Sequence, residues 1–266
     1  MNTEDFFLEV AKRAGFSAED SVLAVCGGGY DRRVLLSCGV KSAVISNVSH
    51  HAGVDEYAPY TWEYQDAENL TVADKSYDWV IVHAGLRHCA SPHRALCEML
   101  RVAKKGVMVV EARDSMVVRI AQRFGLTPDF ELEPALLTGG KSGGYRDTPI
   151  PNYIYRWKER EVEKTVLSFE PDRVPEIEYV YGWRLPVQRM AMSRSPVKRL
   201  AVNLLSIAKP VLETLARKQG NCFGFIIRRS GGVPAWIKTI DGAHVPDLEF
   251  IGRKYDPAAY RRKNQA

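Results

Sequence analysis

Short apolar runs rich in β-branched residues alternate with helical patterns over the first 112 residues of the chain. Helical patterns are clearest at Pro92–Val102, where the apolar residues share one face. Such alternation predicts an α/β fold, in which helices cover both faces of a parallel sheet and ligands bind at the carboxyl ends of its strands. The runs with the length and composition of buried strands are Ser21–Val25, Ser42–Ser46, Trp62–Gln65, Tyr77–Val82 and Gly106–Val110.

The second half of the chain has a looser pattern. Residues 126–152 are rich in Gly, Pro and Thr and predict a mobile loop, and Arg156–Ser168 reads as a helix. Two further strands are expected at Glu176–Tyr181 and Phe223–Arg228, with two helices between them that are separated at Pro210. The tail at 230–266 ends in basic residues and is expected to be extended and partly disordered.

We therefore expect one domain over residues 1–229, with inserted elements at about 126–168 and 184–220 and a basic tail at 230–266. A chain of 266 residues, 45% of them hydrophobic, can enclose a full core. The five cysteines are odd in number and lack C-x-x-C spacing, so neither a metal site nor a disulfide framework is expected. No basic signal-peptide region opens the chain and no apolar run approaches the ~20 residues of a membrane span, so the cytoplasm is the simplest location.

The net charge of +5, with a sequence pI of about 8.9, is a modest basic excess. A solvated basic face explains such an excess more often than a nucleic-acid groove does, and no DNA- or RNA-binding signature accompanies it. We expect no nucleic-acid partner, and the sequence leaves the oligomeric state open.

Consecutive glycines follow the first strand, in the run Cys26-Gly27-Gly28-Gly29. They allow the backbone to approach a ligand closely at the start of a helix, although a merely tight turn would have the same composition. A nicotinamide-dependent oxidoreductase requires the spacing G-x-G-x-x-G, and this chain has Arg32 at the third position. The mismatch disfavours a nicotinamide enzyme.

Three later segments add specificity. Asn47 ends the second strand roughly twenty residues after the glycines, where nucleoside-binding folds place a ribose-binding side chain. The run Gln65-Asp66-Ala67-Glu68-Asn69-Leu70 follows the third strand, and His83-Ala84-Gly85-Leu86-Arg87-His88 ends the fourth. In this order and spacing, the segments resemble the type 11 branch of the class I S-adenosylmethionine-dependent methyltransferases. The resemblance covers about residues 18–112 well and the remainder in outline.

The resemblance implies a Rossmann-like, seven-stranded sheet in the order 3-2-1-4-5-7-6, with helices on both faces. Five strands in the βαβ pattern, followed by two strands joined through a long excursion, fit this topology. Only the last strand, Phe223–Arg228, is then antiparallel to its neighbours.

The resemblance also implies S-adenosylmethionine as the cofactor and assigns it residue by residue. Gly28 falls beneath the methionine part, with Cys26 and Gly27 in the same loop, and Asn47 falls on the ribose position. Departures from the family pattern are Ala24 and Asn47, where an acid is usual, and Cys26 and Tyr30, where a glycine is usual. An amide lacks the charge-assisted strength with which a carboxylate binds a hydroxyl. The remaining assignments are Asp66 to the adenine amino group, Ala67 to the adenine ring, and His83 and Ala84 to the segment beside the transferable methyl.

His83 is the first candidate catalytic residue. An imidazole beside a hydroxyl nucleophile can take its proton near neutral pH. A histidine that only hydrogen-bonds a backbone group at the strand end is an equal alternative. His88 is a second candidate, for which helix capping or exposure to solvent is favoured.

Aromatic and arginine side chains at Tyr153, Tyr155 and Arg156 lie where this fold usually inserts its substrate-recognition element. Such residues make good pocket walls, and we assign them to substrate binding over ordinary helix packing.

Between Gly182 and Gly220 the chain carries eight basic residues against a single acid, Glu213, and its apolar residues follow helical spacing. A basic amphipathic helix can lie on an anionic membrane or cover a pocket for a lipid-linked substrate. Docking on the sheet explains most amphipathic helices and is the favoured interpretation, with peripheral membrane contact through 184–220 as the alternative.

The expected function is methyl transfer to a small or lipid-linked hydroxylated acceptor, such as a sugar, a quinone precursor or a secondary metabolite. A catalytically weak or inactive methyltransferase-like binding protein is the alternative, favoured by Ala24, Tyr30 and Asn47. A nucleotide-dependent oxidoreductase is a third and disfavoured possibility, because the third glycine is missing.

Overall fold

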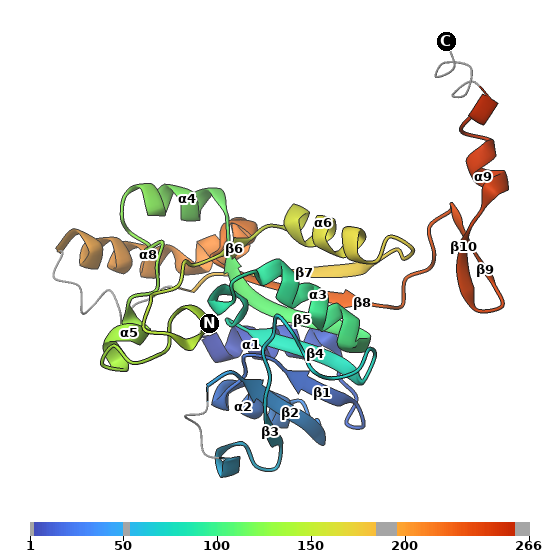
Figure 1. The fold of residues 1–266 in the computed structure, drawn as a ribbon. Helices are drawn as coiled ribbons and strands as arrows, with labels where there is room; N and C mark the ends of the chain where they lie inside the picture. The colour runs from blue at the N-terminus through green and yellow to red at the C-terminus, as the bar shows by residue number, and fades with distance from the viewer. Residues whose placement is uncertain (1–2, 50–53, 185–195, 259–266) are drawn as a thin grey trace.

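The computed structural model describes residues 3–49, 54–184 and 196–258 (Figure 1). The first half alternates strands and helices as the sequence predicts. Its elements are α1 (Thr3–Ala14), β1 (Ser21–Ala24), α2 (Gly29–Ser37), β2 (Ser42–Asn47), η1 (Val54–Tyr57), β3 (Thr61–Tyr64), β4 (Tyr77–His83), η2 (Leu86–His88), α3 (Pro92–Val102) and β5 (Ala103–Arg113).

The second half supplies the insertions and the antiparallel strands. Its elements are α4 (Met116–Arg123), α5 (Glu133–Leu137), η3 (Tyr145–Asp147), β6 (Arg156–Trp157), α6 (Glu159–Phe169), β7 (Glu176–Gly182), α8 (Pro196–Leu215), η4 (Arg217–Gln219), β8 (Cys222–Arg228), β9 (Ile237–Ile240), β10 (Ala243–Pro246) and α9 (Leu248–Gly252).

The main sheet has the order β3-β2-β1-β4-β5-β8-β7, which confirms the predicted order 3-2-1-4-5-7-6 because β7 and β8 are the sixth and seventh predicted strands. β8 runs antiparallel to both β5 and β7, and the pairs from β3 to β5 are parallel. The short strand β6 adds a parallel pairing to the end of β5, through Ala112 and Arg156. The sequence did not predict β6.

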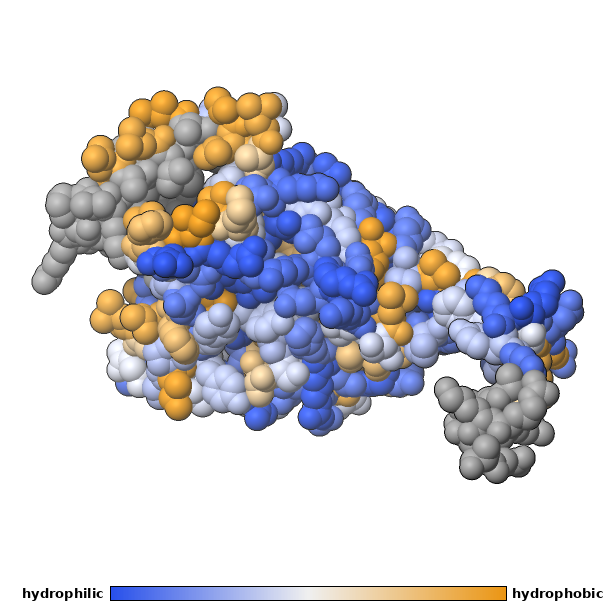
Figure 2. Space-filling view, turned by 90° about the horizontal axis from the view of Figure 1, so that it is seen from above, coloured by the Kyte–Doolittle hydropathy of each residue, from blue (hydrophilic) through white to orange (hydrophobic). Residues whose placement is uncertain are grey.

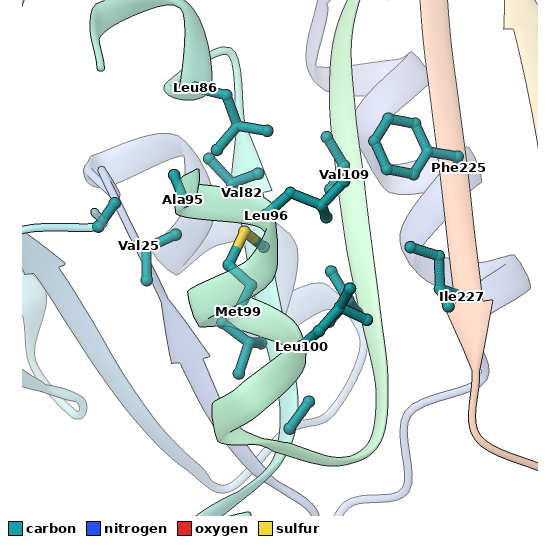
Figure 3. Close-up of a cluster of buried hydrophobic side chains, with 14 of the residues drawn as sticks. Val25, Val82, Leu86, Ala95, Leu96, Met99, Leu100, Val109, Phe225 and Ile227 are labelled. Carbon is teal, nitrogen blue, oxygen red and sulfur yellow. The ribbon is translucent and has the colours of Figure 1, made fainter. Parts of the chain in front are cut away.

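Side chains of successive strand residues point to opposite faces of the sheet, and this alternation divides the core in two. Leu23 and Val25 of the first strand segment pack with α3 and α6 on one face, as Figure 3 shows for Val25, Leu96 and Met99. Val22 and Ala24 pack on the other face in a cluster that includes α1 and α2 residues. The predicted cover of helices on both faces is therefore confirmed.

Two helix predictions for the second half were wrong. Arg156 and Trp157 pair with β5 as a strand, and the helix begins only at Glu159, where the Glu161 carboxylate accepts a hydrogen bond from the Lys158 N–H. Pro210 lies inside one helix, α8, and does not separate two.

The tail also contains more structure than an extended segment would. The strands β9 and β10 form a hairpin whose turn residues, Asp241 and Gly242, have φ values of 50° and 80°. Positive φ at both central residues is the geometry of the type I′ turn, which Asp-Gly favours. The hairpin is a separate two-stranded sheet, and the chain from 259 lies outside the described residues.

The residues from 126 to 152 contain α5 and η3, although a loop was expected. Tyr145 N–H donates to the Ile150 carbonyl at 2.7 Å and Gly144 N–H to the Thr148 carbonyl at 2.9 Å, which closes a compact turn. This turn lies beside residues 84–88, which follow β4 and are called the post-β4 segment, because His88 contacts the Gly144 carbonyl.

Candidate active site

The glycine loop at the carboxyl end of β1 has one crowded and one open glycine. Gly27 N–H donates to the Ser46 carbonyl at 2.8 Å, and a Cβ on Gly27 would lie 3.0 Å from the Ile45 side chain. At Gly28 the backbone is extended, and a Cβ there would meet no atom within 4 Å. The Gly28 backbone therefore borders open space at the N-terminus of α2, where a ligand can approach.

Cys26 has a φ of 51°, in the left-handed region that favours glycine. The usual family glycine at this position therefore has a conformational reason, and a cysteine accepts the same backbone at a cost of about 1–2 kcal/mol.

Asn47 joins the ends of β1 and β2. Its amide N–H donates to the Gly27 carbonyl at 3.1 Å, and its amide oxygen accepts from the Ser49 N–H at 3.3 Å. The Asn47 carbonyl accepts from the Gln65 N–H at 3.3 Å, which brings the end of β3 to the same edge.

Asp66 follows Gln65 at the carboxyl end of β3. One oxygen of the Asp66 carboxylate accepts from the Glu68 N–H at 2.9 Å, and the other forms an ion pair with the Arg146 guanidinium at 3.1 Å. The neighbouring Ala67 is buried in the core cluster on the α3 side of the sheet, so its backbone is fixed. The residues predicted to hold the cofactor thus lie along one edge, at the carboxyl ends of β1, β2 and β3.

The post-β4 segment packs directly on the glycine loop. A Cβ on Gly85 would lie 2.4 Å from Cys26 Cβ, so only glycine fits at this contact. Ala84 has a φ of 57°, and its N–H donates to the Val110 carbonyl at 2.8 Å. His83 and Ala84 are therefore held against the edge that carries the predicted cofactor residues.

His83 ends β4, and its ring is held by aromatic side chains. It stacks on Phe7 of α1 with ring centroids 4.5 Å apart, and Tyr30 of α2 approaches edge-on at 6.2 Å. Its ring nitrogens have no hydrogen-bond partner among the described residues. Burial, with the positive charges of Arg87 and Arg184, lowers the pKa of His83 to about 4. The imidazole is therefore neutral near pH 7, with nitrogens available to a substrate.

Glu111, at the end of β5, is a fully buried carboxylate that organises the post-β4 segment. It accepts hydrogen bonds from the Leu86 N–H at 2.8 Å and from the Arg87 guanidinium at 3.3 Å. Arg87 also donates to Glu131 at 3.0 Å, in the segment that follows α4. Burial raises the pKa of Glu111, although the charge of Arg87 opposes the shift.

His88 lies against the inserted segment. Its Nδ1 is 3.2 Å from the Gly144 carbonyl oxygen, and its Nε2 is 3.5 Å from a Glu131 carboxylate oxygen. Burial and the nearby Arg87 lower the pKa of His88. Both ring nitrogens therefore face structural partners, and we assign His88 to positioning the insert.

The three predicted substrate residues lie near one another and differ in exposure. Tyr153 is exposed, whereas Tyr155 and Arg156 are half-buried. The Tyr155 hydroxyl is 3.4 Å from His93 Nε2, and its ring is edge-on to Trp157. Arg156 donates to the Pro128 carbonyl at 2.6 Å.

A shallow hollow of about 520 Å³ lies beside these residues. Its walls are mainly apolar, and Phe130 in its wall packs edge-on to Tyr153 at 5.6 Å. Glu131, next in the chain, contacts Arg87 and His88 and so connects this part of the chain to the post-β4 segment. The lining of the hollow is Pro128, Asp129, Phe130, Leu132 and Pro151.

Sequence reasoning missed two residues that shape the site. Glu111 could have been found as a lone acid that ends the apolar run of the fifth strand. Phe7 gave no signal, because its contact with His83 joins residues 76 positions apart in the chain.

Comparison with known families indicates what kind of site this is. The family model described as a methyltransferase domain matches residues 25–110, from the end of β1 to the His83-bearing strand and on into β5. This segment is therefore similar to the methyltransferase domains of the type 11 branch. Methyl transfer is the reaction of such domains, and S-adenosylmethionine is the cofactor that the match implies.

Solved structures share the fold of this chain over most of its length. The YcgJ protein from Bacillus subtilis is 12% identical with a TM-score of 0.52, and 86% of this chain and 99% of that one are covered. A putative methyltransferase from Haloferax volcanii, in complex with the Trm112 activator, is 16% identical with a TM-score of 0.52, covering 85% and 92%. The cyclase SpnF is 17% identical with a TM-score of 0.53, covering 86% and 82%. No curated protein sequence matches the chain.

The residues at the carboxyl ends of β1, β2 and β3 fit S-adenosylmethionine. Gly28 offers an open backbone for the methionine part, Asn47 an amide for the ribose, and Asp66 a carboxylate for the adenine amino group. The side chains of Ala24 and Ala67 are buried, and the resemblance assigns the backbone of Ala67 to the adenine ring.

The adenine assignment predicts that Asp66→Ala weakens S-adenosylmethionine binding by roughly 1–3 kcal/mol, because a buried partner of the amino group is lost. Calorimetric titration measures the effect. Asp74→Ala is the matched control, since the Asp74 side chain is 74% exposed and pairs only with Arg101. Equal affinity for the parent protein and the Asp66 variant would place the adenine elsewhere.

The buried carboxylate of Glu111 predicts that Glu111→Ala lowers the free energy of unfolding by about 2–4 kcal/mol, because Arg87 and the Leu86 N–H lose a buried partner. Urea denaturation with an unchanged slope measures this loss. In Glu19→Ala, where the side chain is 76% exposed, a change of less than about 1 kcal/mol is expected. Similar losses in both variants would show that Glu111 does not organise the segment.

Proposed function

We propose that this methyltransferase acts on a hydroxyl group of a small or lipid-linked molecule, and that His83 orients that hydroxyl. The observation that carries the proposal is the neutral imidazole of His83, held by Phe7 at the end of β4 and without a hydrogen-bond partner among the described residues. S-adenosylmethionine, when bound, supplies a methyl group activated by a positively charged sulfur.

A neutral imidazole can accept a hydrogen bond from a hydroxyl and so direct the oxygen toward its target. Holding reacting atoms in line supplies much of the catalysis in such displacements. Efficient general bases have a pKa near the working pH, whereas burial, Arg87 and Arg184 lower the pKa of His83 to about 4. Orientation, with little proton transfer, is therefore the role that this environment favours.

The hollow beside Tyr153 favours an acceptor with an apolar portion. Most of its lining is apolar, and it adjoins the post-β4 segment through Glu131. Sugars that carry a lipid, quinone precursors and aromatic secondary metabolites all combine a hydroxyl with an apolar portion. The chemistry of the hollow does not select among them.

The cytoplasm remains the proposed location. All five cysteines are free thiols in the structure, which is typical of a reducing compartment.

Substitution of His83 tests its role in turnover. His83→Ala should lower kcat by about 10²-fold through lost orientation, and His83→Gln, whose amide oxygen can still accept the hydrogen bond, should stay within about tenfold of the parent. Losses of ~10²–10⁴-fold in both variants would show that His83 takes the proton. His244→Ala is the control, because His244 pairs with Asp172 away from the site.

The low pKa of His83 also predicts the pH profile. Because the folded pKa of about 4 lies below the ordinary histidine pKa of 6.5, the neutral form persists as pH falls from 8 to 5. The hydrogen-bond acceptor is therefore retained, and kcat/KM should show no inflection near pH 6.5 that depends on His83. The associated stability is fully present above pH 6.5 and is lost as the pH falls through 4. An inflection near 6.5 that His83→Gln removes would contradict this assignment.

A catalytically weak family member is the alternative, and Asn47 favours it. Both polar atoms of the Asn47 amide are already hydrogen-bonded within the loop, which leaves less capacity for a ribose hydroxyl. Transfer of a radiolabelled methyl group from S-adenosylmethionine into molecules of a cell extract separates the two functions. Label incorporation that depends on the protein supports the proposed enzyme, and its absence despite cofactor binding supports the alternative.

A further inference from the structure

Helix α4 exposes an apolar stripe to solvent. Met116, Ile120 and Phe124 follow one another at four-residue spacing along and just beyond the helix, and Phe124 is 72% exposed. Val118 lies on the other side and is buried, and Ser115 caps the helix by accepting from the Val118 N–H. The apolar stripe of a surface helix normally faces the core, so this one requires a partner.

Helix α8 has a second exposed stripe. Leu200, Leu204, Ile207, Val211 and Leu215 are spaced by four, three, four and four residues, which places them on one face. All five side chains are exposed, and 79% of the Ile207 surface is accessible to solvent. Leu200 and Leu204, which the sequence places on the face expected to dock on the sheet, are thus exposed. The other apolar residues of that expected face, Val197, Ala201, Leu205 and Ala208, lie outside the described side chains.

The α5 region adds a third group. Leu136 and Leu137 of α5 are 82% and 85% exposed, and Leu132 just before the helix is also exposed. Figure 1 shows α4, α5 and α8 at the same end of the molecule, and Figure 2 shows apolar residues gathered at that end. We call the exposed apolar residues of α4, α5 and α8 the docking surface.

The docking surface is fixed to the end of the sheet that carries the active site. Helix α4 follows β5, and the junction between them is hydrogen-bonded to the chain after α8. Ser115 donates to the Gln219 carbonyl at 2.8 Å, and Arg113 donates to the Lys218 carbonyl at 2.8 Å. Trp183 donates to the Ala216 carbonyl at 3.1 Å. The stripe of α8 is therefore anchored beside the end of β5.

Exposed basic residues occur in the same elements and beside them. Arg119 and Arg123 are exposed on α4, and Arg184, Arg217 and Lys218 are exposed before and after α8. In sequence, the segment from Gly182 to Gly220 carries eight basic residues and one acid. Juxtamembrane basic residues are attracted to anionic headgroups, and two copies of such a basic surface repel each other. No described helix is long and apolar enough to cross a bilayer, which leaves contact along the surface of one.

We propose that the docking surface binds an anionic phospholipid bilayer, with its apolar residues among the acyl chains and the neighbouring Arg119 and Arg123 at the headgroups. The hollow that includes Leu132 then opens at the bilayer surface. A lipid-linked acceptor could then reach the site without leaving the membrane, and this consequence rests on the proposed function. The binding of the docking surface to the bilayer does not depend on the proposed function.

Co-sedimentation of the full chain with vesicles tests this inference. Binding is expected to vesicles of equal parts phosphatidylglycerol and phosphatidylcholine, and weaker binding to phosphatidylcholine alone. Phe124→Glu and Ile207→Glu, singly and together, should weaken binding at least about tenfold, because each places a like charge at the anionic surface. Leu248→Glu is the matched control, with a side chain of similar size at 73% exposure in α9.

Failure of the parent chain to bind either vesicle, or equal binding by the parent and the double variant, would overturn the inference. A parent dimer in vesicle-free sedimentation that the double variant converts to a monomer would also overturn it, by assigning the surface to a second copy. Calorimetric titration with S-adenosylmethionine is run on the same variants. Unchanged affinity in them shows an intact fold, whereas absent binding by the parent counts against the proposed function and leaves vesicle binding to be judged separately.

Discussion

The buried carboxylate of Glu111 is the interaction on which the active-site region depends. Glu111 lies near the end of β5, and its carboxylate accepts hydrogen bonds from the Leu86 N–H in the post-β4 segment and from the Arg87 guanidinium. Arg87 also forms an ion pair with Glu131, in the segment that follows α4. Burying a charge is costly unless it is paired and hydrogen-bonded, so these groups must assemble together. One residue thus links the sheet, the segment beside His83 and the inserted element.

The close contact between Gly85 and Cys26 complements this linkage. Because no side chain fits at position 85, the post-β4 segment packs directly against the glycine loop. Asn47 is hydrogen-bonded to Gly27, and Gln65 is hydrogen-bonded to Asn47, so the ends of β2 and β3 extend the same surface. A cofactor at the carboxyl ends of the strands would therefore meet a continuous and largely preformed wall.

How much the sequence predicted depended on how local the determining contacts are. Alternation in residues 22–25 predicted the two core clusters, and the strand order followed because the βαβ units are regular. The short strand β6 has no periodicity in two residues, and the type I′ turn at Asp241-Gly242 was overlooked although its sequence favours it. Helical spacing in α8 indicates which residues share a face, yet it cannot say whether a face is buried, and Leu200 and Leu204 are exposed.

The candidate site was predictable to a similar degree. The strand-end residues Asn47, Asp66 and His83 lie where the βαβ pattern places them, whereas Tyr155 and Arg156 turned inward because α3 and the Pro128 carbonyl provide their partners. Titration of the parent protein with S-adenosylmethionine and, separately, with NAD tests the central claim most directly. Saturable binding of S-adenosylmethionine with no heat from NAD is the predicted result. Binding of NAD without binding of S-adenosylmethionine would contradict the account.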